Sequence, residues 1–86
     1  MQKVTIYTTP WCGYCHRAKG LLKKLKIPFE DIDVSGDTEK RQWLVQTTGQ
    51  RTVPQIFIGD DSIGGCDELH ALHRSGQLMP RVSESA

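Results

Sequence analysis

The chain has 86 residues, of which 37% are hydrophobic and 24% charged, and its formal net charge is +1. Such a length and composition are typical of one globular domain with a small core, which we expect to span residues 1–86. A net charge near zero gives no electrostatic reason to expect nucleic acid or an anionic membrane as a partner, and no apolar run approaches the roughly 20 residues of a membrane span.

The first predicted elements are a strand over residues 3–8 and a helix over residues 13–26. Residues 4–7 are β-branched or aromatic, which is typical of a strand. Apolar side chains then recur at helical spacing, at Ala18, Leu21, Leu22 and Leu25. This spacing predicts one apolar stripe on a helix that packs against the core.

Two cysteines, Cys12 and Cys15, stand where this strand gives way to the helix. Positions three apart share one face of a helix, so the two thiols lie within reach of a disulfide. Extending the apolar stripe back from Ala18 places Cys15 toward the core and Cys12 at the exposed tip. The free N–H groups and the dipole at a helix N-terminus stabilise a thiolate. The pattern therefore predicts a redox pair in which Cys12 attacks and Cys15 follows.

A structural zinc site is the alternative interpretation of this pair. C-x-x-C is also half of a zinc site, and Cys66 and His70 could add two ligands at helical spacing. Zinc-ribbon cysteines usually sit on tight knuckles and not on the first turn of an amphipathic helix. We therefore favour the redox pair with no metal, and three cysteines with one left unpaired fit that chemistry.

The remaining predicted elements follow in chain order: a strand over residues 29–34, a helix over 39–48, a strand over 55–58, a short strand over 62–63 and a helix over 66–75. Asp37 or Thr38 is the expected N-cap of the second helix, and Trp43 and Leu44 are expected to face inward. The polar tail of residues 80–86 is expected to be frayed.

These elements occur in the order βαβαββα. The first βαβ unit requires a right-handed crossover and parallel strands, and the last two strands form an antiparallel hairpin. The predicted fold class is therefore α/β, with a four-stranded mixed sheet flanked by three helices.

Three short motifs, taken together in this order, resemble the glutaredoxins of the short bacterial dithiol type, within the thioredoxin-like superfamily. They are Cys12-Gly-Tyr-Cys15, Thr52-Val53-Pro54 and Gly64-Gly65-Cys66-Asp67, and the resemblance covers residues 3–79. Trp11-Cys12-Gly13 is similar to thioredoxin itself, but Tyr14 replaces the proline of thioredoxin. The resemblance implies a thioredoxin-like fold and a single glutaredoxin domain.

The resemblance also implies an enzyme, a glutathione-dependent thiol–disulfide oxidoreductase. Cys12 would attack a disulfide or a glutathionylated protein, and Cys15 would resolve the intermediate by forming the Cys12–Cys15 disulfide. Glutathione would be the co-substrate, with no bound cofactor, and the partners would be glutathione and disulfide-containing or glutathionylated client proteins. We expect the protein to be a monomer. We also expect it in the cytoplasm, since the N-terminus lacks the apolar region of a signal peptide.

A glutathione site is implied at Tyr14, Arg41, Arg51, Thr52, Val53, Pro54, Gly65, Cys66 and Asp67. A cis Val53–Pro54 bond would leave the main chain of Val53 free to pair with glutathione like an added strand. The helix N-terminus at Asp67 would take a carboxylate, and the Asp67 side chain the ammonium. Helix capping alone is the alternative role for Asp67, and plain solvent exposure is the alternative for the two arginines, which would hold the glycine carboxylate.

Thr9 departs from the family pattern. Many relatives carry a lysine at this place, shortly before the first cysteine, where a cation would stabilise the Cys12 thiolate and bind a carboxylate. Placement at the helix N-terminus must then carry more of the activation of Cys12.

A second implied function is an iron–sulfur cluster carrier. Relatives with Gly or Ser between the cysteines hold a cluster between two protomers, using the first cysteine and glutathione. Gly13 permits this alternative without requiring it.

Overall fold

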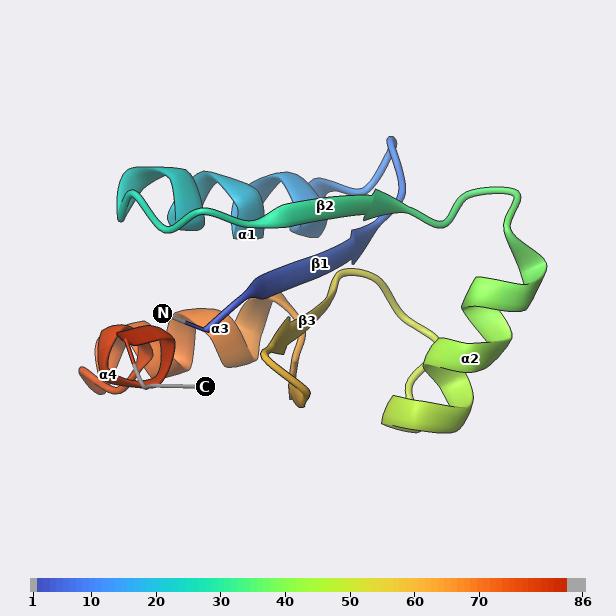
Figure 1. The fold of residues 1–86 in the computed structure, drawn as a ribbon. Coiled ribbons are helices and arrows are strands. Elements are labelled where there is room, and N and C mark those ends of the chain that lie inside the picture. The colour runs from blue at the N-terminus through green and yellow to red at the C-terminus, as the bar shows by residue number, and fades with distance from the viewer. Residues whose placement is uncertain (1, 84–86) are drawn as a thin grey trace.

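The computed structural model describes residues 2–83 (Figure 1). The elements in chain order are β1 (Val4–Thr8), α1 (Gly13–Lys24), β2 (Glu30–Asp33), α2 (Thr38–Thr48), β3 (Gln55–Ile58), β4 (Asp61–Gly64), α3 (Cys66–Arg74) and α4 (Leu78–Ser83). The four strands form one mixed sheet in the order β2-β1-β3-β4. Strand β1 runs parallel to β2 and antiparallel to β3, and β3 and β4 form an antiparallel hairpin. The predicted α/β topology is therefore confirmed.

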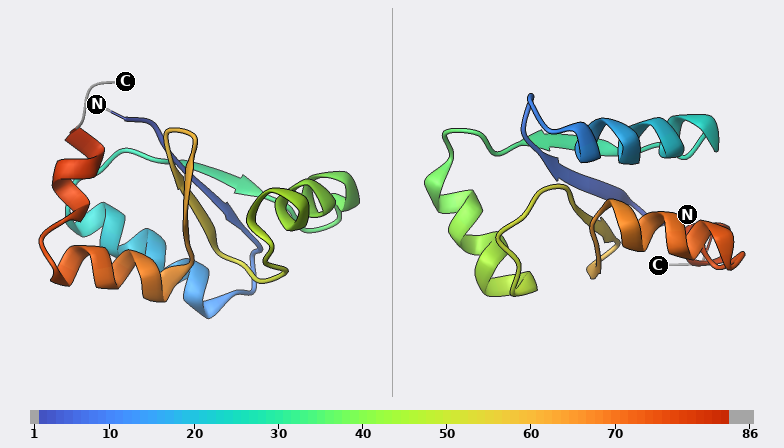
Figure 2. Two further views of the ribbon diagram at one scale, coloured as in Figure 1. Left: turned by 90° about the horizontal axis from the view of Figure 1, so that it is seen from below. Right: turned by 180° about the vertical axis from the view of Figure 1, so that it is seen from behind.

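Helices cover the two faces of this sheet unequally (Figure 2). Alternate residues of a strand point to opposite faces, and the two central strands, β1 and β3, are almost wholly buried. One face packs against α1, α3 and α4 in the larger core, which includes Val4, Ile6, Leu22, Ile56 and Leu69. The other face contacts α2 in a smaller cluster of Tyr7, Val34, Leu44 and Phe57. Helices α1 and α3 lie side by side, and their N-termini lie close to the loop that precedes β3.

A fourth helix, α4, corrects the predicted count of three. The sequence prediction treated residues 80–86 as a frayed tail, but Leu78 and Val82 are buried with 1% and 0% exposure. The carbonyl of Val82 also accepts a 2.7 Å hydrogen bond from the backbone N–H of Gln2. Residues 84–86, the rest of the expected tail, lie outside the described residues. Over the part of the chain that is described, no helix is long and apolar enough to cross a membrane.

The first helix ends earlier than predicted, at Lys24 instead of Lys26. Lys26 adopts a left-handed backbone with φ of 58°, and the N–H of Ile27 bonds the Leu22 carbonyl at 2.9 Å. This six-to-one hydrogen bond closes the helix in the way that a glycine usually does. Capping of α2 follows the prediction, because the Asp37 carboxylate accepts the N–H of Lys40 at 3.0 Å.

Trp43 was predicted to face inward, and this is only half correct. Leu44 is buried at 3% exposure, whereas Trp43 is 42% exposed. The indole of Trp43 lies over the smaller cluster instead of within it, with ring centroids 5.6 Å from Tyr7 and 5.7 Å from Phe57. These tilted and stacked rings fix one side of α2 on the sheet.

Gly20 gives a first testable prediction, because its position inside α1 has no packing reason. An added Cβ would meet nothing within 4 Å. Since glycine costs about 1 kcal/mol against alanine inside a helix, Gly20→Ala is expected to raise the free energy of unfolding by about that amount in urea titrations. Gly49→Ala is the matched control, because its space is equally open but its φ is +73°. It is expected to lower stability. Equal effects of the two substitutions would contradict this account.

Candidate active site

The sulfur of Cys12 caps helix α1. Cys12 has an extended backbone, and its Sγ accepts the backbone N–H of Cys15 at 3.1 Å. Ser, Thr, Asn or Asp oxygen usually fills this role at a helix N-cap. Here the free N–H groups of the first turn face a sulfur atom, so negative charge on that sulfur is stabilised by the helix N-terminus.

The two thiols differ sharply in access, as the sequence predicted. Cys15 is completely buried, while Cys12 is partly exposed and its Sγ lies 3.5 Å from the carbonyl oxygen of Val53. Both cysteines are free thiols, so the structure represents the reduced dithiol. An incoming disulfide can therefore reach Cys12 and cannot reach Cys15 directly.

Burial raises the pKa of Cys15 to about 12, and a hydrogen bond to Cys12 adds to this shift. The backbone N–H of Thr9 and the charge of Lys19 act in the opposite direction and moderate it. Cys15 is therefore a thiol at neutral pH and must lose its proton before it can attack a disulfide.

The Val53–Pro54 peptide bond is cis, as the resemblance implied. The loop that carries it is held by Gln55, whose amide Nε2 donates to the Thr52 carbonyl at 2.9 Å and contacts the Thr52 hydroxyl at 3.4 Å. Gln55 is only 2% exposed. Sequence reasoning missed this residue, and the available signal was a polar side chain at the start of an otherwise apolar strand.

The start of α3 approaches the same loop through Gly65. A Cβ built on Gly65 would lie 3.0 Å from the carbonyl oxygen of Pro54, which only glycine avoids without a shift. The N–H of Gly65 donates to the Glu68 carboxylate at 2.6 Å, so Glu68 reaches back to cap the helix. Sequence reasoning placed Asp67 and Glu68 in the first turn of this helix but considered only Asp67 for the capping role.

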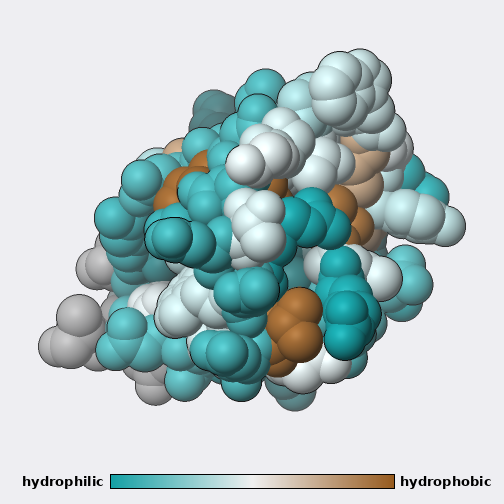
Figure 3. All heavy atoms as spheres, turned by 90° about the vertical axis from the view of Figure 1, so that its right-hand side faces the viewer, coloured by the Kyte–Doolittle hydropathy of each residue, from teal (hydrophilic) through white to brown (hydrophobic). Residues whose placement is uncertain are grey.

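A groove of about 670 Å³ lies between α2 and the residues that precede the cis bond. Four of the predicted glutathione-site residues line it: Arg41, Arg51, Thr52 and Val53. Figure 3 views the side of the molecule on which α2 lies, where hydrophilic side chains surround small hydrophobic patches. The predicted residues Tyr14, 57% exposed, and Asp67, also exposed, are not among the residues that line this groove.

Cys66 is buried at the start of α3, and burial raises the pKa of its thiol. Its Sγ lies 3.5 Å from Nδ1 of His70, one turn along the helix. Within residues 2–83, no group of three or more His, Cys, Asp or Glu side chains is placed to hold a metal ion. The four candidate zinc ligands thus form two pairs, Cys12 with Cys15 and Cys66 with His70, and among the described residues these pairs do not combine into the four-ligand set of a structural site.

The glutaredoxin family model matches residues 4–63. The chain belongs to the glutaredoxin family. A glutaredoxin of Pseudomonas aeruginosa is 51% identical over 83 residues, which are 96% of this chain and 99% of the relative. Glutaredoxin 3 of Escherichia coli strain K12 is 46% identical over 80 residues, with 93% and 96% of the two chains covered.

Solved glutaredoxin structures share the fold. A glutaredoxin of Brucella melitensis superposes with a TM-score of 0.85 at 42% identity, over all of this chain and 96% of the other. A buckwheat glutaredoxin–glutathione complex gives a TM-score of 0.87 at 37% identity, covering 93% of this chain and 76% of that one. Glutaredoxins are glutathione-dependent thiol–disulfide oxidoreductases, and this chain is an enzyme of that class with the predicted thioredoxin-like fold.

Gly65→Ala tests the close approach of α3 to the Pro54 carbonyl. The added methyl group forces a shift of a few tenths of an ångström between two walls of the site. We expect KM for glutathione to rise roughly tenfold, because small misplacements of positioning groups are costly, with little change in melting temperature. Gly20→Ala is the control, since its Cβ meets nothing. An unchanged KM in Gly65→Ala would show that the approach has no role in binding.

The buried Cys15 predicts a pH dependence of stability. In the unfolded chain this thiol ionises near its ordinary pKa of 9.0, but in the folded protein it stays protonated to about pH 12. Between these values the unfolded state has released a proton that the folded state retains, so stability falls as pH rises. Urea unfolding under reducing conditions should show a steeper decline above pH 9 in the wild type than in Cys15→Ala. Parallel declines in the two proteins would contradict the assignment.

Proposed function

We propose that Cys12 is the attacking thiol of this glutathione-dependent oxidoreductase and that Cys15 is the resolving thiol. The unequal placement of the two sulfurs carries the proposal: one is partly exposed and caps a helix N-terminus, and the other is fully buried one turn later. An attacking thiol needs access and a stabilised negative charge, whereas a resolving thiol needs only to reach its neighbour.

The reaction follows from these roles. The Cys12 thiolate attacks a mixed disulfide between a client and glutathione, the client leaves as a thiol, and Cys12 becomes bonded to glutathione. A second glutathione clears this intermediate and leaves as glutathione disulfide, which restores Cys12. With a protein disulfide, the client remains bonded to Cys12 until Cys15 attacks and forms the Cys12–Cys15 disulfide. Two glutathiones then reduce that disulfide.

Glutathione is proposed to lie along the residues implied by the family resemblance. The main chain of Val53, beside the Cys12 sulfur, suits pairing with an extended tripeptide. Arg41 and Arg51 line the adjacent groove and provide cations for its glycine carboxylate. Similarity to the buckwheat complex supports this placement. Tyr14, Thr52, Pro54, Gly65, Cys66 and Asp67 complete the proposed site.

Client proteins are proposed to dock on the apolar surface around Cys12. Trp11 and Tyr14 flank this residue and are 87% and 57% exposed. We further propose that residues 1–86 act as one domain and as a monomer in the cytoplasm. Analytical ultracentrifugation and cell fractionation test these last two statements, and a dimer or an exported protein would overturn them.

The iron–sulfur alternative is not part of this proposal. No contact within residues 2–83 favours cluster binding over thiol chemistry, and the open space beside Gly13 fits either. Visible absorbance of the anaerobically purified protein would instead support binding of an iron–sulfur cluster.

Substitution of each cysteine in turn tests the assigned roles. Cys12→Ser is expected to abolish both deglutathionylation and the reduction of protein disulfides. Cys15→Ser should keep deglutathionylation, because a second glutathione can clear Cys12. It should reduce turnover of protein disulfides by roughly 100-fold or more, because the neighbouring thiol acts at high effective concentration. Both activities are measured with glutathione, glutathione reductase and NADPH.

The control is Lys24→Ser, which should leave both activities near the wild-type level, because Lys24 is exposed in the last turn of α1 and lies outside the proposed site. If Cys15→Ser loses deglutathionylation as completely as Cys12→Ser does, the division into attacking and resolving thiols is wrong.

A further inference from the structure

We propose that Lys19 is a positioning residue for the second thiol, and that the Asp31 carboxylate and the Thr8 hydroxyl hold its charge beside Cys15 during the intramolecular step. The inference rests on the proposed function, because it assumes that Cys15 resolves a mixed disulfide at Cys12.

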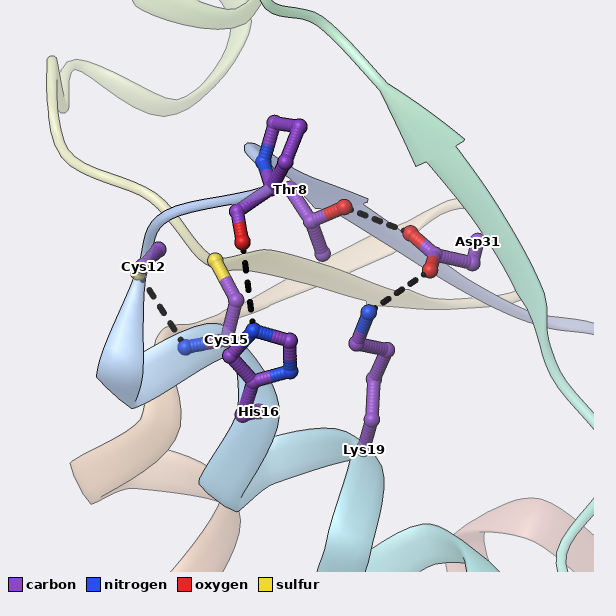
Figure 4. Close-up of polar contacts among 7 residues, drawn as sticks. Thr8, Cys12, Cys15, His16, Lys19 and Asp31 are labelled. Carbon is purple, nitrogen blue, oxygen red and sulfur yellow. Dashed lines mark hydrogen bonds and ion pairs between the residues drawn. The ribbon is translucent and has the colours of Figure 1, made fainter.

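Lys19 lies on the same face of α1 as Cys15. The two residues are four apart, so their Cβ atoms are about 5 to 6 Å from each other. Figure 4 shows both side chains directed from α1 toward the sheet. The Lys19 side chain is only 19% exposed, which is rare for lysine, whose head group is usually in water. A specific partner must hold it there.

That partner is Asp31 on β2. Lys19 Nζ donates to Oδ2 of Asp31 at 2.9 Å, and the Thr8 hydroxyl donates to Oδ1 at 2.6 Å (Figure 4). Both carboxylate oxygens are therefore in use, and the three side chains connect α1, β1 and β2. Partial burial disfavours ionisation of Asp31, but the hydrogen bonds from Thr8 and Lys19 outweigh it and hold the pKa of this carboxyl below its ordinary value. The carboxylate is thus charged at neutral pH and fixes the ammonium in place.

Thr8 links this ion pair to the active-site loop. It is the last residue of β1, and the next residue, Thr9, directs its backbone N–H at the Cys15 sulfur. The ammonium of Lys19 and the N–H of Thr9 are the two groups that favour the Cys15 thiolate against the effect of burial. One hydrogen-bonded unit therefore places both.

The surrounding groups give Cys15 little other help. The titratable and charged side chains in and around this unit are Cys12 at the N-cap of α1, His16, Arg17 and Lys19 from α1, Asp31 and Asp33 from β2, and Cys66 from α3. His16 is exposed and its Nε2 contacts the Pro10 carbonyl at 3.2 Å. Cys66 is a neutral buried thiol, and the two aspartates are anions. Lys19 is the cation that acts on Cys15, whereas Arg17 acts on Cys66.

The step at issue is balanced without any further reactant. Cys15 loses its proton and attacks the sulfur of Cys12, which is bonded to glutathione. The Cys15–Cys12 bond forms, the bond between Cys12 and glutathione breaks, and glutathione leaves as a thiolate that takes up a proton. Because Cys15 is buried, a nearby positive charge lowers the cost of this transient anion.

The test follows the intramolecular step directly in Lys19→Met. Reduced enzyme is mixed with excess glutathione disulfide and quenched with acid at successive times. Mass spectrometry then separates the Cys12–glutathione adduct from the intramolecular disulfide. The decay rate of the adduct is measured from pH 6 to pH 10, with melting temperatures to confirm folding.

Removing this nearby charge should raise the pKa of Cys15, and we expect about tenfold less thiolate at neutral pH. The more basic thiolate is more nucleophilic, so the net loss in rate is about threefold. Because burial keeps Cys15 mostly protonated from pH 6 to pH 10 in both proteins, their rates should rise in parallel with pH and the gap should stay constant. Lys19→Arg, which keeps the charge, should restore the rate. Lys23→Met is the matched control, an exposed lysine one turn further along α1, and should leave the rate unchanged.

The outcomes separate this inference from the function on which it rests. If wild-type adduct decays without forming the Cys12–Cys15 disulfide, the proposed function fails. If that disulfide forms normally but Lys19→Met matches the wild type, or Lys19→Arg is as slow as Lys19→Met, the positioning role is refuted. If Lys19→Met does not fold, Lys19→Gln is put through the same measurement, and the same two results decide.

Discussion

One hydrogen bond determines most of the chemistry of this molecule, the bond from the backbone N–H of Cys15 to the sulfur of Cys12. It makes one thiol the cap of a helix, and it places the other on the first turn of the same helix, facing the core. The difference between the sulfurs is therefore a difference of helix position. Strand β1 delivers the chain to this point, and the apolar stripe of α1 fixes which way the helix faces.

Local patterns predicted most of the fold, because they depend on neighbours in the chain. The Asp37 cap, the buried strand β3 and the stripe of α1 all follow from spacing and residue type. Helix α4 was missed because the polar composition after Pro80 was interpreted as a frayed tail. Pro80 is the third residue of α4, in the first turn, where no intrahelical N–H is required. Leu78 and Val82, four residues apart, were the available signal for this helix.

The features of the candidate site also divide into those that local patterns predict and those that depend on tertiary contacts. The access of Cys12 and the burial of Cys15 could be predicted, because both depend on the phase of one helix. Contacts between groups that strand pairing brings together could not be predicted in this way. Thr8 and Asp31 are 23 residues apart and meet only through the parallel register of β1 and β2. Sequence spacing contains no direct record of that contact. Gln55 and Thr52 are only three residues apart, and their contact depends on the conformation of the loop before β3.

The attachment of α2 has a consequence for the affinity of the groove that it borders. This helix has one buried side chain, Leu44, and is otherwise held by the rings around Trp43. An element with so small a buried surface opens locally at a lower free energy than the rest of the domain. We therefore expect the wall that carries Arg41 to be displaced in a fraction of molecules, which lowers the apparent affinity of the groove for a ligand accordingly. Amide hydrogen exchange in α2 measures the free energy of this local opening, and therefore how much the weak packing of α2 lowers the affinity of the groove.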